Sequence, residues 1–454
     1  MKKLIIYTVF AVMVSSCHIY RNFPETTTVD KELYGQEYVS ADTSTLASLS
    51  WRELFTDMYL QRLVDSALLR NTDLRVARLR TEQAEALLLN ARLSYLPSFG
   101  LSAEGTLSKL GSESMSKTYS LGGSASWEVD IFGRITNAKR GAREALEASK
   151  AYEQAVQTNI VATVATGYYT LLMLDEQLRI SRATLVNWEK RIHMLEALKR
   201  GGGGVTDAAV LQAKANRMSL ESAVLSIEKG IREAENTLCT LLAIPPTAFV
   251  RGVLAEQSFP EKLSVGLPIQ LLAHRPDIRM AEHQLAQAFY ATNAARGAFY
   301  PSINLSGSLG WTNNGGGVEL NPTQWLLNAI GSLTQPLFNK GTHVANLKIA
   351  KAEQNAALLT FRQALLAAGA EVNNALAALQ TSRGKLLIDG EQVSLLQEAV
   401  RKTELLMRHS SMNYLEVLTA QQTLLDAEQA VAQDKFDEIQ SIISLYHALG
   451  GGVQ

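Results

Sequence analysis

Two neighbouring carboxylates, Glu128 and Asp130, are an example of a pair that could in principle do acid–base chemistry. Such a pair can pass protons to and from a substrate. The two residues alternate, however, with the apolar residues Trp127, Val129 and Ile131. This period of two places both carboxylates on the polar face of a strand, where solvated side chains are expected. The pair therefore gives an enzyme only weak support.

The glycine run at residues 201–204 is the next candidate, because glycine-rich loops can cradle phosphate groups. It lacks a following Lys-Ser/Thr pair and a preceding strand, so the tip of a helical hairpin is the better interpretation. We find no nucleophile motif, phosphate loop or zinc signature in the sequence. The sequence therefore predicts a protein that is not an enzyme and has no catalytic residue and no cofactor.

Two cysteines are present, Cys17 and Cys239. Cys239 lies in the stretch NTLCTLLA, which favours a small buried apolar side chain on a helix. Neither a second Cys nor a pair of His at ligand spacing lies nearby, so no metal site is predicted.

The N-terminus has the pattern of a secretory signal peptide. Lys2-Lys3 precede an apolar run over residues 4–14, which is too short to cross a hydrocarbon core of roughly 30 Å. The following VSSC, ending at Cys17, is similar to a bacterial lipoprotein box, in which cleavage precedes the Cys and the thiol is lipidated. We therefore expect a signal peptide over residues 1–16 and lipidation of Cys17. An ordinary signal peptide with an unmodified Cys is the alternative.

Charge excludes one class of partner. The chain has 43 Lys and Arg against 44 Asp and Glu, with no basic block and no basic stripe interleaved with aromatic residues. Such a surface is not suited to neutralise a phosphate backbone, so nucleic acid is not an expected partner.

The elements that position these residues occur twice. The stretch ARLSYLPSFGLSAEG at residues 91–105 resembles ARGAFYPSINLSGSL at residues 295–309. An ungapped offset of 204 aligns residues 71–102 with eleven identities in thirty-two positions. A repeat of about two hundred residues is far longer than a solenoid unit. The sequence therefore predicts two copies of one architectural half.

Long helices are predicted where proline is absent, between residues 98 and 244 and between 337 and 454. Apolar residues recur at helical spacing from Arg134 to Lys199 and from Lys340 to Arg408, and each run corresponds to on the order of 100 Å. A break and a second helix follow each run. Each half should therefore contain a very long helical hairpin that packs along its neighbours.

Each half also contains two stretches that alternate with a period of two. In residues 119–131 the odd positions are apolar or Gly and the even positions are Ser, Gly, Glu or Asp. Residues 98–107 and 302–311 alternate in the same sense, and residues 325–336 do so less cleanly. These stretches predict four strands. Pro97 and Pro301 mark the junction in each half, where a helix should end at the residue before the proline and a strand should begin.

Four strands cannot close a membrane barrel, which needs at least about eight. The edges must therefore be paired by other chains, and a trimer gives twelve strands and a ring of twelve antiparallel helix segments. Outward Leu, Ile and Trp with small polar residues on the other face are typical of a membrane barrel. The candidate interface aromatics are Tyr119, Trp127, Trp311 and Trp325. The alternative is a half-buried sheet packed against the protein's own helices.

Together these features resemble the TolC-like outer-membrane factors, especially the lipoprotein branch called NodT or OprM-like. The resemblance covers nearly the whole mature chain. Its most specific pieces are the box at Cys17, RPDIRMAE at 275–282, FYPSINLSGSLG at 299–310, NYLEVLTAQQTLLDAEQ at 413–429 and LYHALGGG at 445–452. It implies an α+β, internally duplicated fold. The long helical hairpins would form a periplasmic α-barrel, and the four strands would join a trimeric, twelve-stranded transmembrane β-barrel.

The resemblance implies a homotrimeric exit duct in the outer membrane, lipid-anchored and extending into the periplasm. It would passively conduct substrates delivered by an inner-membrane pump of the RND type and a periplasmic adaptor, also called a membrane fusion protein, with outer-membrane lipid around the barrel. The outer-membrane component of a type I protein or peptide secretion system and a periplasmic helical scaffold are the alternatives. Drug, metal-ion and peptide exporters share this component, so the substrate stays open.

The chain is expected to divide as follows. Residues 1–16 are the signal peptide and residues 17–50 a lipidated N-terminal extension. Residues 51–243 form the first repeat, with strands at about 98–110 and 118–131. Residues 244–266 are a linker, and residues 267–454 form the second repeat, with strands at about 302–312 and 325–335.

The resemblance also assigns roles to the hairpin ends. The tips would dock the adaptor through Gly201, Gly202, Gly203, Gly204, Ser410 and Ser411. The family usually has a Gly at the second tip, so Ser410-Ser411 is a departure. Acidic residues that ring the periplasmic aperture in the family correspond here to Glu416 and, at the next such position, to Thr419. An ordinary solvated helix residue is the alternative for Glu416. Arg182, Arg191 and Arg200 are candidates for a latch between the hairpins.

Overall fold

The structure is a computed structural model. It describes residues 49–109, 115–202, 205–260, 274–312, 325–409 and 414–452, and the single positions Phe23, Pro24, Leu33, Leu46 and Gly111. The chain divides into two compact units. The first unit comprises Met1–Thr27, Leu79–Ala151 and Arg279–Ala364, and the second comprises Thr28–Arg78, Tyr152–Ile278 and Leu365–Gln454.

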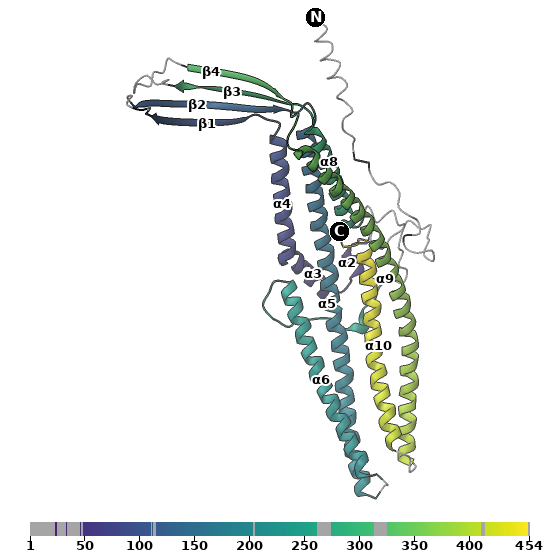
Figure 1. Cartoon of the computed structure of the whole chain (residues 1–454). Coiled ribbons are helices and arrows are strands. Elements are labelled where there is room, and N and C mark those ends of the chain that lie inside the picture. Colours follow the sequence, from purple (N-terminus) through teal and green to yellow (C-terminus); the bar gives the residue numbers. More distant parts are fainter. Residues whose placement is uncertain are drawn as a thin grey trace. The chain divides into compact units, whose positions relative to one another are not determined.

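Both halves of the chain have the same order of elements, as Figure 1 shows. The first half contains α4 (Thr72–Leu93), β1 (Ser98–Ser108), β2 (Ser116–Val129), α5 (Arg134–Arg200) and α6 (Asp207–Leu241). The second half contains α8 (Pro276–Gly297), β3 (Ser302–Thr312), β4 (Trp325–Thr334), α9 (Thr342–His409) and α10 (Tyr414–Ala448). Three short helices complete the described elements: α2 (Trp51–Leu54), α3 (Met58–Arg70) and η4 (Leu254–Glu256). The predicted α+β class and internal duplication are confirmed.

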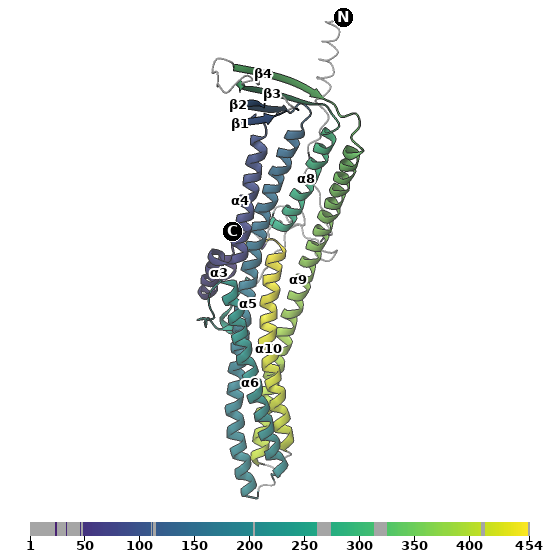
Figure 2. The same ribbon diagram turned by 60° about the vertical axis from the view of Figure 1, so that its left-hand side comes forward.

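The four long helices form two hairpins. In the second unit α5 runs beside α6, and α9 runs beside α10 (Figures 1 and 2). With 67 residues in α5 and 68 in α9, each of these helices is about 100 Å long. Ala, Glu, Gln, Leu and Lys dominate both and no proline interrupts them, so helix formation is favoured throughout. No helix within the described ranges is both long and apolar enough to cross a membrane.

The core of the second unit is aromatic and aliphatic. Phe55, Tyr168 and Tyr169 are fully buried, and the ring of Phe55 meets that of Tyr169 at 6.4 Å and that of Tyr446 at 6.3 Å. Cys239 is buried in α6, as predicted. Burial of these large side chains stabilises the point where the shorter helices meet the hairpins.

One sheet lies in the first unit. Its strands are antiparallel in the order β1-β2-β3-β4, so the two halves join through the pairing of β2 with β3, and β1 and β4 are the edges. The helix boundary before the strands differs from the prediction. Helix α4 ends at Leu93 and α8 at Gly297, four residues before Pro97 and Pro301. A hydrogen-bonded turn fills the interval in the first half, where the Leu96 amide donates to the Leu93 carbonyl at 2.8 Å. Pro97 therefore disfavours the helical conformation at Leu96, a residue of this turn, and not at the last residue of the helix.

The return helices end in the same way in both halves. Ala243 after α6 and Gly450 after α10 have left-handed φ values of 51° and 89°. The next amide then donates back across the last turn, from Ile244 to Cys239 at 3.0 Å and from Gly451 to Tyr446 at 2.9 Å. At Gly450 a side chain would also meet the His274 carbonyl at 2.5 Å. This close approach explains a glycine within the LYHALGGG stretch.

A second repeated contact joins the end of each return helix to the start of the helix that precedes the strands in the same half. Asn71, just before α4, donates to the Leu241 carbonyl at 2.9 Å. Arg275, at the equivalent position before α8, donates to the Ala448 carbonyl at 3.0 Å. Both side chains therefore satisfy a carbonyl that a helix C-terminus leaves without an intrahelical partner. This role of the RPDIRMAE stretch is not visible in the sequence.

Candidate functional site

The sheet has one apolar face and one polar face. Cα partners such as Leu101 with Gly123, Leu309 with Gly123 and Leu309 with Leu327 place the odd-numbered residues of all four strands on the same face. Most even-numbered residues on the opposite face are Ser, Thr, Asn or Gly. The period-two prediction is therefore correct for β1, β2 and β3.

The apolar face is exposed in the single chain. Leu101 is 91% exposed and Leu327 is 75% exposed, and Leu309 in the centre of the sheet is also exposed. The alternative of a sheet half-buried against the protein's own helices is therefore wrong for the described residues, because such packing would cover these side chains. An exposed apolar surface of this size indicates contact with lipid or another chain.

Strand β4 is the exception to clean alternation. Leu326 and Ile330 fall on the otherwise polar face, opposite Gly310 and Ser306, and both are exposed. These two apolar residues on the polar face are the reason that residues 325–336 alternate less regularly in the sequence.

The four aromatic candidates occupy odd-numbered strand positions at two levels of the sheet. Trp127 is near the helix end of the sheet, where its Nε1 donates to the Tyr95 carbonyl at 2.9 Å. Tyr119 and the opposed backbone positions of Trp311 and Trp325 are toward the other end. Eight residues separate Trp127 from Tyr119 along β2, which corresponds to about 26 Å.

The two carboxylates considered for acid–base chemistry have structural roles. Glu128 accepts hydrogen bonds from Arg134, one of them from Nε at 3.0 Å. Asp130 accepts from the amides of Ile135 at 3.0 Å and Thr136 at 2.6 Å and so caps the N-terminus of α5. Both side chains therefore hold the junction between β2 and α5. Within the described part of the chain, no cluster of three or more His, Cys, Asp or Glu is arranged to hold a metal ion.

The hairpin ends are described in part. Gly201 and Gly202 form a turn after α5, and Gly202 has a left-handed φ of 74°, which favours glycine. Lys199 and Asp207 form an ion pair across this tip. Gly203, Gly204, Ser410 and Ser411 lie outside the described residues, as does Cys17.

The gate candidates are at the start of α10. Glu416 is in the first turn and Thr419 is one turn further, so the two lie on the same side of the helix, and both are exposed. A carboxylate in a first turn is also favoured by the helix dipole. Position and exposure therefore fit both the aperture role and the ordinary helix role.

A cluster that the sequence did not reveal joins the two hairpins near this end. Arg191 of α5 pairs with Glu404 of α9, and Gln421 Nε2 of α10 donates to the same carboxylate at 3.4 Å. Burial lowers the pKa of Arg191, and Glu404 opposes that shift. Burial also raises the pKa of the nearby Tyr414 phenol to about 12. The cluster borders a cavity of about 420 Å³ between α5, α9 and α10.

The three arginine candidates for a latch are thereby distinguished. Arg191 contacts the other hairpin, whereas Arg182 donates to Glu228 at 2.7 Å within its own hairpin. Arg200 is exposed at the end of α5. The sequence does not reveal the contact between Arg191 and Glu404, because the two residues are more than two hundred positions apart.

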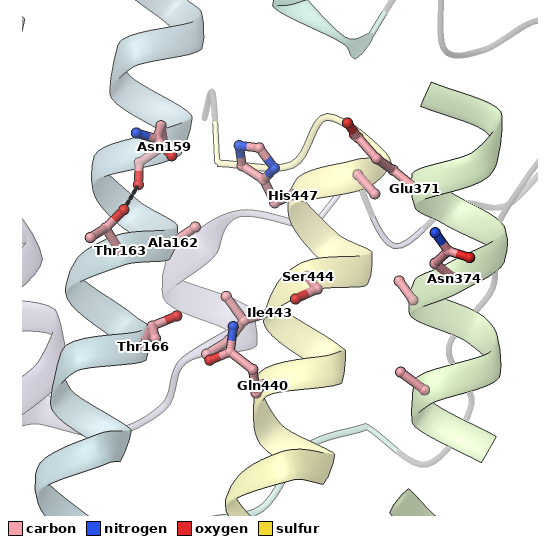
Figure 3. A pocket seen from close by; sticks show the side chains of 13 residues that line it. Asn159, Ala162, Thr163, Thr166, Glu371, Asn374, Gln440, Ile443, Ser444 and His447 are labelled. Atoms are coloured by element: carbon pink, nitrogen blue, oxygen red, sulfur yellow. Dashed lines mark hydrogen bonds between the residues drawn. The ribbon is translucent and has the colours of Figure 1, made fainter. Parts of the chain in front are cut away.

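A second cavity, of about 510 Å³, lies between α5, α9 and α10 in the second unit. Figure 3 shows that hydroxyl and amide side chains from all three helices line it, including Thr166, Asn374 and Gln440. His447 and Glu371 lie at one end, and burial followed by the charge of Arg275 lowers the pKa of His447. The lining is therefore mainly uncharged, with apolar surface between the hydroxyl and amide groups.

Comparison with known proteins agrees with this architecture. The family model described as outer membrane efflux protein matches residues 63–243 and again residues 267–451, which together are more than half of the chain. A cation efflux system protein, CusC from Escherichia coli O6:H1, is 31% identical over 411 residues, covering 89% of this chain and 88% of the relative. The probable outer membrane lipoprotein SilC from Salmonella typhimurium is 30% identical over 410 residues, covering 88% of each.

A solved structure gives the same result for the fold. The crystal structure of CusC, whose title describes folding and transmembrane channel formation, superimposes with a TM-score of 0.87 at 28% identity. The match covers 95% of this chain and 99% of that chain. The two family matches coincide with the two halves that share one element order. The chain belongs to the outer membrane efflux protein family.

Proposed function

We propose that this protein is the outer-membrane exit duct of a tripartite efflux system and that three copies close a barrel of twelve strands. The observation that carries the proposal is a sheet that exposes its apolar face and ends in edge strands of 11 and 10 residues. Long apolar edges favour pairing with another chain. Closure by copies of the same chain removes both edges. Three copies supply twelve strands, which is more than the minimum of about eight that a membrane barrel needs.

The two faces of the sheet then have separate roles. The apolar face contacts lipid, and the polar face lines the duct. Trp127 lies at one membrane interface, and Tyr119, Trp311 and Trp325 lie at the other. The intervening length of about 26 Å along a strand tilted by about 40° corresponds to about 20 Å of height, which is most of a barrel's apolar band of about 25 Å.

The partners follow from the efflux role. The name of CusC, a cation efflux system protein, supports an efflux system over a type I secretion system. An inner-membrane pump of the RND type would supply substrate, and a periplasmic adaptor would dock on the hairpin tips at Gly201–Gly204 and Ser410-Ser411. Co-purification of the adaptor with the wild type, and its loss when the tip glycines are replaced by valines, would test this docking.

Single-channel recording tests the duct directly. Purified protein reconstituted in planar bilayers should give discrete conducting steps. Protein that inserts fully, as judged by protease protection, and yet conducts nothing would exclude a duct and leave the periplasmic scaffold as the function.

The gate is expected to depend on Glu416. Three copies of this carboxylate around a trimer axis would concentrate negative charge at the aperture and attract cations. Glu416→Ala should therefore reduce the cation preference of the conducting trimer several-fold and weaken its block by divalent cations. Glu428→Ala, further along α10, serves as the control. Unchanged selectivity and block in Glu416→Ala would assign Glu416 to an ordinary helix surface.

The membrane anchor is expected at Cys17. SilC is named a probable outer membrane lipoprotein, which supports lipidation of this chain. Radiolabelled fatty acid should label the wild type and not Cys17→Ser. Because one acyl chain binds a membrane only marginally, the barrel should retain most of the variant in the outer membrane. Equal labelling of both proteins would contradict lipidation at Cys17.

A further inference from the structure

The helix ends next to the sheet carry positive charge only. Four stretches of the first unit, residues 86–97, 131–143, 284–300 and 335–352, contain nine Lys and Arg and no Asp or Glu. The whole chain is nearly neutral, with 43 Lys and Arg against 44 Asp and Glu. We call the Lys and Arg residues of these four stretches the cationic collar. Seven of the nine are exposed, and Arg140 and Arg296 are half-buried.

Local helix electrostatics explains only two of these cations. Arg92 and Arg296 are in the last turns of α4 and α8, where the helix dipole favours positive charge. The other seven lie at or near the starts of α5 and α9, and the helix dipole favours negative charge in the first turn. The first turns of α4, α6, α8 and α10 each contain an acidic residue, whereas those of α5 and α9 contain none.

Carboxylates flank the collar stretches on both sides. Among the described residues, Glu128 pairs with Arg134, and Asp130 is bonded to the amides that begin α5. Glu144 follows residues 131–143 directly and contacts His283 at 2.8 Å. The four stretches themselves therefore carry an excess of positive charge that an anionic ligand would balance.

Aromatic rings lie at the same level. The ammonium of Lys139 is 5.2 Å from the centre of the Tyr95 ring, and Trp127 donates to the Tyr95 carbonyl. The guanidinium of Arg140 is 5.8 Å from the centre of the Tyr290 ring. Tyr and Trp next to Lys and Arg are typical of the boundary between lipid chains and headgroups.

We infer that the cationic collar binds the phosphate groups of anionic phospholipids in the leaflet that meets the helix end of the sheet. This inference rests on the proposed barrel, in which the exposed apolar face of the sheet contacts lipid. Each cation near an anionic surface adds attraction, so a trimer with three collars would prefer anionic over zwitterionic lipid.

A contact of Phe23 with α8 is consistent with lipid at the level of the collar. The ring of Phe23 meets that of Phe289 in α8 at 5.7 Å. Cys17 is six residues before Phe23, a reach of at most about 20 Å, and Phe289 is eight residues before the end of α8, about 12 Å. Acyl chains on Cys17 can therefore reach the level of the collar.

Quenching of Trp127 by brominated lipid measures this binding. The parent protein for this experiment carries Trp311→Phe and Trp325→Phe, which remove the tryptophans at the other end of the sheet. The collar variant adds Lys139→Gln, Arg143→Gln, Lys348→Gln and Lys351→Gln. The matched control removes four exposed cations of the second unit through Arg70→Gln, Lys190→Gln, Lys229→Gln and Arg232→Gln. Each full-length protein is reconstituted with brominated phosphatidylglycerol or brominated phosphatidylcholine.

The parent and the control should bind phosphatidylglycerol at least about threefold more strongly than phosphatidylcholine, and 1 M salt should reduce this preference. The collar variant should bind the two lipids almost equally while conducting like the parent. Equal binding of the two lipids by the parent, or a preference retained by the collar variant, would overturn the inference and favour an acidic protein as the partner. Loss of conductance in the parent itself would instead reject the duct.

Discussion

Replacing Leu309 with lysine should destabilise the membrane-inserted protein by about 2–4 kcal/mol. Leu309 is exposed on the apolar face of β3, opposite Gly123 and Leu327. Gly123 is midway between Tyr119 and Trp127 on β2, so the new ammonium would lie well inside the apolar band. The free energy of unfolding, measured by denaturant-dependent folding into liposomes, reports the cost.

The adjacent residue provides the matched control. Ser308 lies on the polar face of the same strand, opposite Ser124, and is also exposed. Ser308→Lys should change the free energy of unfolding by less than about 1 kcal/mol, because its side chain enters the aqueous duct. Equal effects of the two substitutions, or a larger effect at Ser308, would show that the faces of the sheet are assigned the wrong way round.

Replacing Arg275 with alanine should lower the free energy of unfolding of the second unit by about 2–4 kcal/mol. Its side chain is 5% exposed and donates to Asp277 through two nitrogens, at 2.9 and 2.6 Å, to Glu371 at 2.7 Å and to the Ala448 carbonyl at 3.0 Å. Removal leaves a cavity and a buried carbonyl without its donor. Loss of helical circular dichroism in denaturant, at fixed protein concentration, measures the change.

The duplicated half offers the comparison. Asn71→Ala removes the equivalent contact to the Leu241 carbonyl and should cost about 1–2 kcal/mol, since only neutral hydrogen bonds are lost. Arg75→Ala, an exposed arginine on α4, should have little effect. A cost at Arg275 no larger than that at Arg75 would contradict the structural role.

The Arg275 contact also predicts a pH dependence. Burial alone would raise the pKa of Asp277, but the hydrogen bonds from Arg275 hold it below its usual value. Because the pKa of Asp277 is lower in the folded state than in the unfolded state, its ionised form stabilises the folded protein at pH values above the unfolded pKa. This contribution is lost as the pH falls through the pKa of the folded state. The difference between wild type and Arg275→Ala should therefore shrink below about pH 4.

Much of the fold is visible in the sequence because it depends on periodicity. The period of two in residues 98–107, 119–131 and 302–311 predicts three strands and their faces, and the absence of proline predicts the extent of α5 and α9 to within two residues. Both features can be recognised from residues that are close together in the sequence. The alternation of β4 is weaker because Leu326 and Ile330 occupy its polar face.

Contacts between distant residues are not visible in the same way. Arg275 and Ala448 are separated by 173 residues, and Arg191 and Glu404 by 213. Nothing in the local pattern distinguishes Arg191 from Arg182, because both are arginines on one long helix. The ends of α4 and α8 also differ from the prediction, since a turn intervenes before each proline.

The central claim is that the edges of this sheet are paired by other copies of the same chain, and disulfide crosslinking tests it most directly. Ala103→Cys in the middle of β1 would be combined in turn with a cysteine at each position from 327 to 331 of β4. Disulfides form only when the Cβ atoms approach within about 4.5 Å. Cys239 is buried, so it should not react. At one or two of these positions the account predicts covalent dimers and trimers on denaturing gels from inserted, conducting protein, with single-cysteine variants remaining monomeric. Monomers at every position, from protein that has inserted, would contradict a barrel closed by copies of this chain.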